Sequence, residues 1–196
     1  MTKRIGLTGG IACGKSEVQK FLMSQGIPVL DTDRVAHEVM LPGSDVFDAV
    51  VDAFGETILG SDGRIDRPSL GKIVFADPDA RVRLNRLVHP EVGRRWRAWL
   101  EAQTSGLAVV AIPLLFECGL QNEFEGVLCI WAPETIMKQR LLERGLDLPA
   151  ARQRIQSQWP VDRKVRSATW SICNDRSLSD LHREVADWLR DISPQE

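Results

Sequence analysis

The sequence predicts an α/β fold: a five-stranded parallel sheet with helices on both faces, a helical insertion and a small helical lid. Short apolar runs alternate with segments of helical periodicity, the pattern of βα units. A glycine-rich loop lies between the first apolar run and the first helical segment. The second and third apolar runs are about seventy residues apart, far more than a simple crossover needs.

Size and composition limit the classes of partner. A chain of 196 residues corresponds to one domain with small excursions. The net charge of −2 gives no electrostatic reason to expect a nucleic acid or an anionic membrane as partner. The longest apolar run, Leu107–Phe116, contains Pro113 and is too short to span a bilayer. With no signal-peptide core near the N-terminus, we expect a cytoplasmic protein with no obligate protein partner.

The cysteines form neither a CxxC pair nor a zinc-binding spacing, so free thiols are expected at Cys13, Cys118, Cys129 and Cys173. Cys13 lies in the glycine-rich loop next to a helix start, a position that can lower a thiol pKa. The simpler interpretation is that Cys13 is a small packing residue.

The first strand, expected at 4–7, leads into Gly9-x-x-x-x-Gly14-Lys15-Ser16, a complete phosphate-binding loop pattern. The glycines allow backbone angles that let several N–H groups converge on an anion. Lys15 supplies charge to the β- and γ-phosphates, and the hydroxyl of Ser16 suits one Mg²⁺ position. The expected ATP-binding residues here are Gly9, Gly10, Ile11, Ala12, Cys13, Gly14, Lys15, Ser16 and Glu17.

A first helix over 16–25 and a second strand over 27–30 follow, and this strand ends at Asp31-Thr32-Asp33. Ligands of parallel α/β folds bind at the carboxyl ends of the strands, so both carboxylates should face the crevice of the phosphate loop. Asp33 could cap the next helix, act in catalysis, or do both. The third strand, 107–112, lacks the Asp that usually organises Mg²⁺, which leaves Asp31, Asp33 and Glu117 as candidate acids.

The insertion, 34–104, should be helical and should build the site for a second substrate. Helices are expected over 46–54, from Asp66, over 82–88 as far as His89-Pro90, and over 91–103. Trp96 and Trp99 favour core packing over base stacking. Its polar candidates, each more often a surface or core residue than a ligand contact, are His37, Arg64, Lys72 and His89.

A basic segment follows the fourth strand, 127–131. Eight Lys and Arg residues lie between positions 134 and 166, and Arg140 and Arg144 are spaced to share a helix face. Charges of this kind usually form a solvated helix face, but Arg also suits phosphoryl oxygens. Gly145 could act as a hinge, a second basic helix should end at Trp159-Pro160, and together these predict a lid.

The fifth strand, 170–173, ends at Asn174, and Ser177-x-x-Asp180 resembles a capping box before an amphipathic helix. The expected domains are a nucleotide-binding core (1–33, 105–133 and 167–196), an acceptor-binding domain (34–104) and a lid (134–166).

Among phosphate-loop proteins, the sequence favours a small kinase. The guanine-binding Asn-Lys-x-Asp of GTPases is missing, and Asp52-Ala53-Phe54-Gly55 lies at a helix end, which suggests a chance match to their Asp-x-x-Gly element. A motor ATPase would need a longer chain and a Walker-B acid. A long insertion, a carboxylate after strand two and an Arg-bearing lid fit a P-loop kinase.

Several elements spread over the chain resemble the dephospho-CoA kinase family. The most specific are the Thr-Gly-Gly form of the loop, His89-Pro90 and Pro113-Leu114-Leu115-Phe116-Glu117. The resemblance extends from residue 5 to about 190, in family order, and further includes Asp31-Thr32-Asp33, Ala36-His37-Glu38, Pro42-Gly43, Asp62-Gly63, Arg67, Leu84-Asn85, Gln158, Ala168 and Asn174.

The resemblance implies transfer of the γ-phosphoryl group of ATP, with Mg²⁺, to the ribose 3′-hydroxyl of dephospho-coenzyme A. It implies that Asp33 is the general base, which a carboxylate beside the γ-phosphate can be, and that Arg140 acts with Lys15 on the transferring group. Weaker lid candidates for ATP are Arg144 and Arg154, and Asn174 falls in the adenine-binding loop. The implied acceptor-binding residues are Asp33, His37, His89 and Leu114, and the metal ligands Ser16 and Asp31.

Two departures from the family pattern are Cys13, where Gly or Ser is usual, and Thr32, where Ala or Gly is usual. Two alternatives stay open at this point: a kinase of a nucleoside monophosphate or of a metabolite such as shikimate, and a non-catalytic nucleotide-binding regulator.

Overall fold

The computed structural model describes residues 2–192, without the side chain of Phe75. Its residues form two compact units: one holds those up to Leu30 and from Gln103 onward, and the other holds Asp31–Ala102. The predicted boundaries, after 33 and 104, lie within three residues of these divisions. The segment predicted as a lid belongs to the first unit by its contacts. No helix within residues 2–192 is long and apolar enough to cross a membrane.

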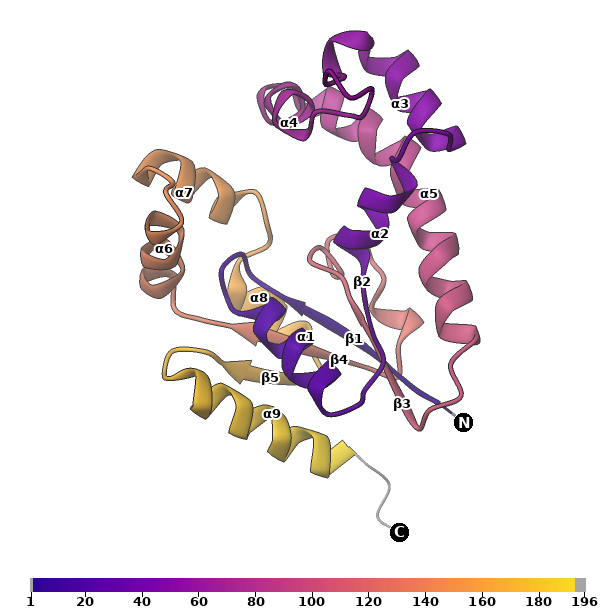
Figure 1. The fold of residues 1–196 in the computed structure, drawn as a ribbon. Coiled ribbons are helices and arrows are strands. Elements are labelled where there is room, and N and C mark those ends of the chain that lie inside the picture. The colour runs from indigo at the N-terminus through magenta and orange to yellow at the C-terminus, as the bar shows by residue number, and fades with distance from the viewer. Residues whose placement is uncertain (1, 193–196) are drawn as a thin grey trace. The chain divides into compact units, whose positions relative to one another are not determined.

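A five-stranded sheet forms the centre of the first unit, in the order β2-β3-β1-β4-β5 (Figure 1). Strand β1 is parallel to β3 and β4, and β4 is parallel to β5. The predicted fold class is confirmed. The strands are β1 (Lys3–Gly9), β2 (Val29–Asp31), β3 (Leu107–Ala111), β4 (Gly126–Trp131) and β5 (Trp170–Cys173).

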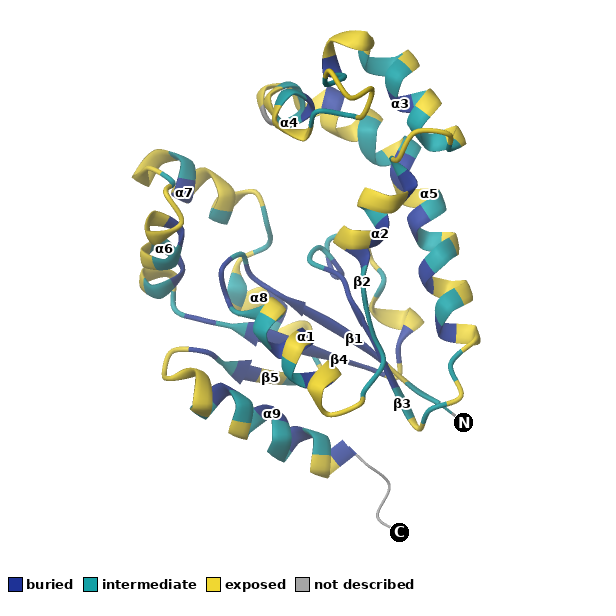
Figure 2. Cartoon of the chain, viewed as in Figure 1, coloured by how far each residue is buried: buried dark blue, intermediate teal, exposed yellow. Residues whose placement is uncertain are grey.

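The three inner strands are apolar because helices cover them on both faces. Leu7 on β1 lies opposite Ala111 of β3 and Leu128 of β4, and all three residues are fully buried. Figure 2 shows β1, β3 and β4 as an almost continuous buried layer. The carboxyl end of β1 is therefore a rigid support for the loop that follows it.

The helices of the first unit follow from right-handed crossovers between parallel strands. Helix α1 (Lys15–Ser24) connects β1 to β2 and lies beside α9 (Leu178–Ile192) against the sheet (Figure 1). The connection from β4 to β5 runs the other way across the sheet. It contains α6 (Glu134–Glu143), α7 (Leu148–Gln156) and α8 (Val161–Ser167), of which α8 packs on β4.

Helix α8 was not predicted from the sequence. The prediction treated 134–166 as two helices ending at Trp159-Pro160, but α7 ends at Gln156 and Pro160 is the N-cap residue of a third helix. Proline is acceptable at a helix start because the first amides have no intrahelical partner. The predicted opening of α7 is confirmed, since the carboxylate of Asp147 accepts a hydrogen bond from the amide of Ala150 at 2.8 Å.

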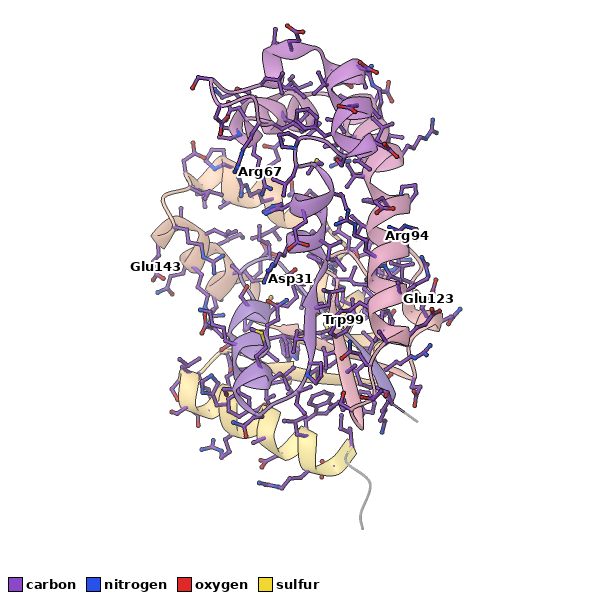
Figure 3. The ribbon with its side chains drawn as sticks, turned by 45° about the vertical axis from the view of Figure 1, so that its right-hand side comes forward. Asp31, Arg67, Arg94, Trp99, Glu123 and Glu143 are labelled. Atoms are coloured by element: carbon purple, nitrogen blue, oxygen red, sulfur yellow. The ribbon has the colours of Figure 1, made fainter. Side chains whose placement is uncertain are left out.

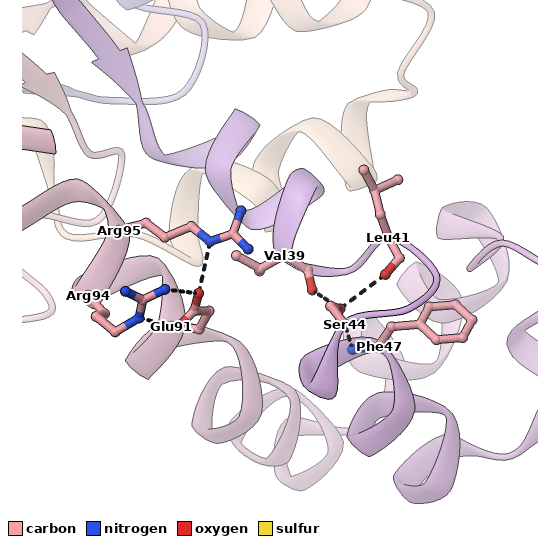
Figure 4. Close-up of polar contacts among 7 residues, drawn as sticks. All are labelled: Val39, Leu41, Ser44, Phe47, Glu91, Arg94 and Arg95. Carbon is pink, nitrogen blue, oxygen red and sulfur yellow. Dashed lines mark hydrogen bonds and ion pairs between the residues drawn. The ribbon is translucent and has the colours of Figure 1, made fainter. Parts of the chain in front are cut away.

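The second unit is helical, as predicted. It contains α2 (Thr32–Val39), α3 (Asp45–Phe54), the short helix η1 (Glu56–Ile58), α4 (Arg67–Ala76) and α5 (Pro78–Glu101). Ser44 connects α2 to α3: its hydroxyl donates to the carbonyl of Val39 at 2.6 Å and accepts from the amide of Phe47 at 3.0 Å (Figure 4).

The predicted break at His89-Pro90 is wrong, because α5 is a single 24-residue helix with Pro90 inside it. An internal proline costs about 3 kcal/mol by removing one hydrogen bond and crowding the preceding turn. The buried residues Val88, Val92, Trp96 and Leu100 form one stripe, at intervals of four, on both sides of the proline. Packing of that stripe offsets the local cost, and it makes Trp96 a core residue, as expected.

The exposed side of α5 carries a charged cluster. Glu91 forms ion pairs with Arg94 at 2.8 Å and Arg95 at 2.9 Å (Figure 4). Hydrogen bonds from these two guanidinium groups lower the pKa of Glu91 to about 2. The cluster is a local feature of the helix surface and takes no part in the candidate site.

Candidate functional site

The phosphate loop is shaped by close packing of its glycines. A Cβ on Gly9 would lie 2.3 Å from the carbonyl oxygen of Ile130, so no side chain fits there. Gly14 has φ +96°, and a Cβ on it would lie 2.1 Å from Nδ2 of Asn174. The expectation that both glycines supply unusual backbone angles holds for Gly14; Gly9 serves close approach instead. Ala12 also has a positive φ, 59°, which stores strain in the loop.

Two side chains from later elements brace this loop. Asn174, buried after β5, donates from Nδ2 to the carbonyl of Cys13 at 2.9 Å. Arg140, on α6, donates from Nη1 to the carbonyl of Ala12 at 3.2 Å and from Nη2 to the carbonyl of Asn174 at 3.0 Å. Their bonds to the loop carbonyls help to leave its amides for an anion.

Lys15 and Ser16 begin α1, directly after Gly14. Lys15 is half-buried and Ser16 is exposed, so both heads are accessible at the positive end of the helix. Glu17 in the same turn pairs with Lys20 at 2.8 Å. On the other side of the loop, the amide of Ile11 donates to Oε1 of Gln158 at 3.1 Å, which links the loop to the segment after α7.

Cys13 is a packing residue. Its thiol is fully buried, and burial raises its pKa to about 11 despite opposing effects of Arg140 and Lys164. The possibility that the helix start activates this thiol is therefore wrong, and the simpler interpretation stands. The described cysteines Cys13, Cys118, Cys129 and Cys173 are all free, as expected.

A buried ion pair lies beyond β3, where a Walker-B strand would place its acid. Lys164 is fully buried, donates to the carbonyl of Pro113 at 3.0 Å and pairs with Glu117 at 2.9 Å. Glu117 also accepts the amide of Trp159 at 2.8 Å. Glu117 is thus an internal partner of Lys164 through Oε1, whereas its buried Oε2 has no hydrogen-bond partner among the described residues. Lys164 was predicted to be one of the charges of a solvated helix face, and no local pattern in the sequence indicates its burial.

Among the other predicted residues of the first unit, Leu114 is half-buried in the turn after β3. Arg144 is exposed at the C-cap of α6, one residue beyond the helix. Arg140 and Arg144 therefore differ: Arg140 is fixed against the loop, whereas Arg144 lies at a helix end next to Gly145, whose φ is +86°.

In the second unit, the candidate acids lie at the start of α2. Asp31 is the N-cap residue, because its carboxylate accepts from the amide of Asp33 at 2.9 Å. The alternative that Asp33 caps this helix is wrong, and Asp33 is exposed. His37 lies one turn further along α2. Partial burial lowers its pKa, Arg67 lowers it further, and Asp33 and Asp31 act in the opposite direction. His89 is exposed in the middle of α5.

Comparison with known proteins connects this arrangement to one family. A model of the dephospho-CoA kinase family matches residues 3–180. A dephospho-CoA kinase of Streptomyces avermitilis is 43% identical over 192 residues, which covers 96% of this chain and 93% of the relative.

Two solved structures extend the likeness to the whole fold. One, from Thermus thermophilus, has a TM-score of 0.84 at 35% identity and covers 98% of this chain and 99% of its own. A dephospho-CoA kinase from Campylobacter jejuni has a TM-score of 0.72 at 28% identity, with 98% of each chain covered. The match over nearly the full length, together with the braced phosphate loop, shows that the chain belongs to the dephospho-CoA kinase family.

Proposed function

We propose that the protein transfers the γ-phosphoryl group of ATP to the ribose 3′-hydroxyl of dephospho-coenzyme A, giving coenzyme A and ADP in the last step of coenzyme A biosynthesis. The observation that carries this proposal is the family match over residues 3–180 on a chain whose phosphate loop is fully built. The alternative of another small-molecule kinase has no comparable support.

In this proposal the backbone amides of the loop, including that of Gly14, bind the triphosphate together with the side chain of Lys15. Mg²⁺ neutralises charge on the β- and γ-phosphates when bound. The exposed hydroxyl of Ser16 suits one ligand position, and Asp31 is the candidate acid. Residues 2–192 contain no cluster of three His, Cys, Asp or Glu side chains that could hold a metal. This fits an ion held mainly by phosphates and water, as Mg²⁺ usually is.

The proposed base is Asp33. Its carboxylate is exposed and can accept the proton of a sugar hydroxyl as that oxygen attacks the γ-phosphate. Since Asp31 caps α2, Asp33 is not needed to hold the helix start. Arg140, which now bonds two backbone carbonyls, has a fork of donors suited to charge that develops on the phosphoryl oxygens.

Release of ADP with a panel of acceptors tests the proposal. We expect dephospho-coenzyme A to stimulate Mg²⁺-dependent ADP release strongly, whereas AMP and shikimate leave it near the acceptor-free rate. Stimulation by AMP or shikimate alone would assign a different kinase. ATP binding without acceptor-dependent release would favour a nucleotide-binding regulator.

A further inference from the structure

A small cavity lies entirely within the helical unit. It measures about 150 Å³ and is lined by His37, Met40, Leu41, Arg64, Ile65 and Arg67. Ligand pockets for whole drug-sized molecules typically measure about 300–1,000 Å³. A cavity of this size therefore suits one chemical group of a larger ligand.

The charge of this cavity favours an anion. Three of its six lining residues carry basic groups and none is acidic. Arg67 makes no hydrogen bond or ion pair with a residue of the described chain, and Arg64 has only Asp62, 4.0 Å away and equally exposed. Met40, Leu41 and Ile65 supply the apolar part of the lining.

The local backbone structure places both arginines at the cavity. Arg64 follows a tight turn closed by a hydrogen bond from the amide of Gly60 to the carbonyl of Arg64 at 2.8 Å. Arg67 is the first residue of α4, where the helix dipole disfavours a cation. Asp66, the N-cap residue, makes no capping bond to the amides there. Arg67 therefore gains nothing from its helix, and an anion would benefit from both the side chain and the helix start.

The location of the cavity beside α2 indicates which anion it would bind. Asp33 and His37 are four residues apart, so they share one helix face about 6 Å apart along the axis. Arg67 is close enough to His37 to lower its pKa. Figure 3 labels Arg67 and Asp31, which mark the cavity and the start of α2. In dephospho-coenzyme A, the 3′-hydroxyl and the 5′-diphosphate are attached to the same ribose.

We infer that His37, Arg64 and Arg67 bind the diphosphate of the acceptor, one helical turn from Asp33. This inference rests on the proposed function, because the diphosphate belongs to the proposed acceptor. It assigns a role in acceptor recognition to residues outside the nucleotide site. Binding the diphosphate there would bring the ribose of the acceptor to Asp33, and it would distinguish dephospho-coenzyme A from acceptors that lack a diphosphate.

The test compares two acceptors and two variants. Adenosine has the same ribose hydroxyls as dephospho-coenzyme A but no diphosphate. For Arg67→Gln we expect kcat/KM with dephospho-coenzyme A to fall roughly tenfold or more, the usual worth of a charge-assisted contact. The Kd for adenosine, measured by calorimetric titration, should change less than about twofold, and KM for ATP should be unchanged. Arg94→Gln is the matched control, since Arg94 is an exposed arginine of the same unit outside the cavity.

Arg64→Gln provides a second, independent variant and should show the same acceptor-dependent loss. A matching loss of affinity for adenosine, or no loss of kcat/KM with dephospho-coenzyme A, would overturn the inference. Wild-type protein that shows no ADP release with dephospho-coenzyme A would instead refute the proposed function. Active wild type with an unaffected Arg67→Gln variant would refute this inference alone.

Discussion

The nucleotide loop and the cavity of the helical unit are both built to receive phosphate groups, but in different ways. Around the loop, the backbone of Ile130 leaves no space at Gly9 and the side chain of Asn174 leaves none at Gly14, and the buried Asn174 fixes a loop carbonyl. In the cavity, the exposed side chains of Arg64 and Arg67 supply the charge. In our proposal, ATP binding is therefore preorganised in the loop, whereas acceptor recognition depends on long side chains that single substitutions can remove without strain.

The largest effect should come from the one mobile charge at the loop. We expect Lys15→Ala to abolish phosphoryl transfer, because no other side chain directly follows the loop to neutralise the β- and γ-phosphates. Circular dichroism should show an unchanged fold. Lys20→Ala, an exposed lysine on the same helix, is the control and should keep near-normal activity.

The buried ion pair of Lys164 and Glu117 tests how much the interior of the first unit contributes to its stability. Lys164→Met leaves Glu117 buried and unpaired, so we expect a loss of about 3–5 kcal/mol in the free energy of unfolding. Urea denaturation measures this loss. The double variant Lys164→Met/Glu117→Leu should recover much of it, and equal destabilisation of the single and double variants would show that the pair is not coupled.

Asp33, near the start of the helical unit, should affect turnover rather than nucleotide affinity. For Asp33→Asn we expect kcat to fall roughly 10²-fold or more, the usual contribution of a positioned base, with the Kd for ATP unchanged. Asp31 still caps α2 in this variant. Asp48→Asn, an exposed acid on α3, is the control; near-normal kcat in Asp33→Asn would remove Asp33 from the mechanism.

Glycine substitutions distinguish packing from backbone strain. Gly14→Ala places a Cβ against Asn174, whereas Gly26→Ala has the same left-handed strain with open space around it. We expect Gly14→Ala to weaken ATP binding roughly tenfold or more. Gly26→Ala should cost about 1–2 kcal/mol of stability and leave the Kd for ATP unchanged. Calorimetric titration with ATP would disprove this if both variants bound it alike.

The smallest effect concerns pH and the acceptor cavity. The pKa of His37 is already below its ordinary value, and Arg64, Arg67, Asp31 and Asp33 are the charged groups around it. An anion favours the protonated imidazole, so dephospho-coenzyme A should bind more tightly as the pH falls from 8 through the ordinary value of about 6.5. The Kd should decrease about twofold to fivefold over this range, and the decrease should be absent in His37→Gln.

The two regions also differ in how well sequence predicts them. The apolar strands and most helix starts depend on local patterns, and those predictions are confirmed. The continuity of α5 through Pro90 was not predictable locally, because tertiary packing of its buried stripe outweighs the cost of proline. Lys164 looked like any surface lysine, since its burial depends on a partner, Glu117, 47 positions away in the sequence.

The position of the transferred phosphate tests the central claim most directly. We would incubate the protein with ATP, Mg²⁺ and dephospho-coenzyme A and locate the new phosphomonoester by phosphorus–proton correlation in nuclear magnetic resonance. The account predicts a correlation to the proton on the 3′ carbon of the ribose, and no product from a 3′-deoxy acceptor. A phosphate on the 2′ oxygen or on the pantetheine hydroxyl, or turnover of the 3′-deoxy acceptor, would contradict it.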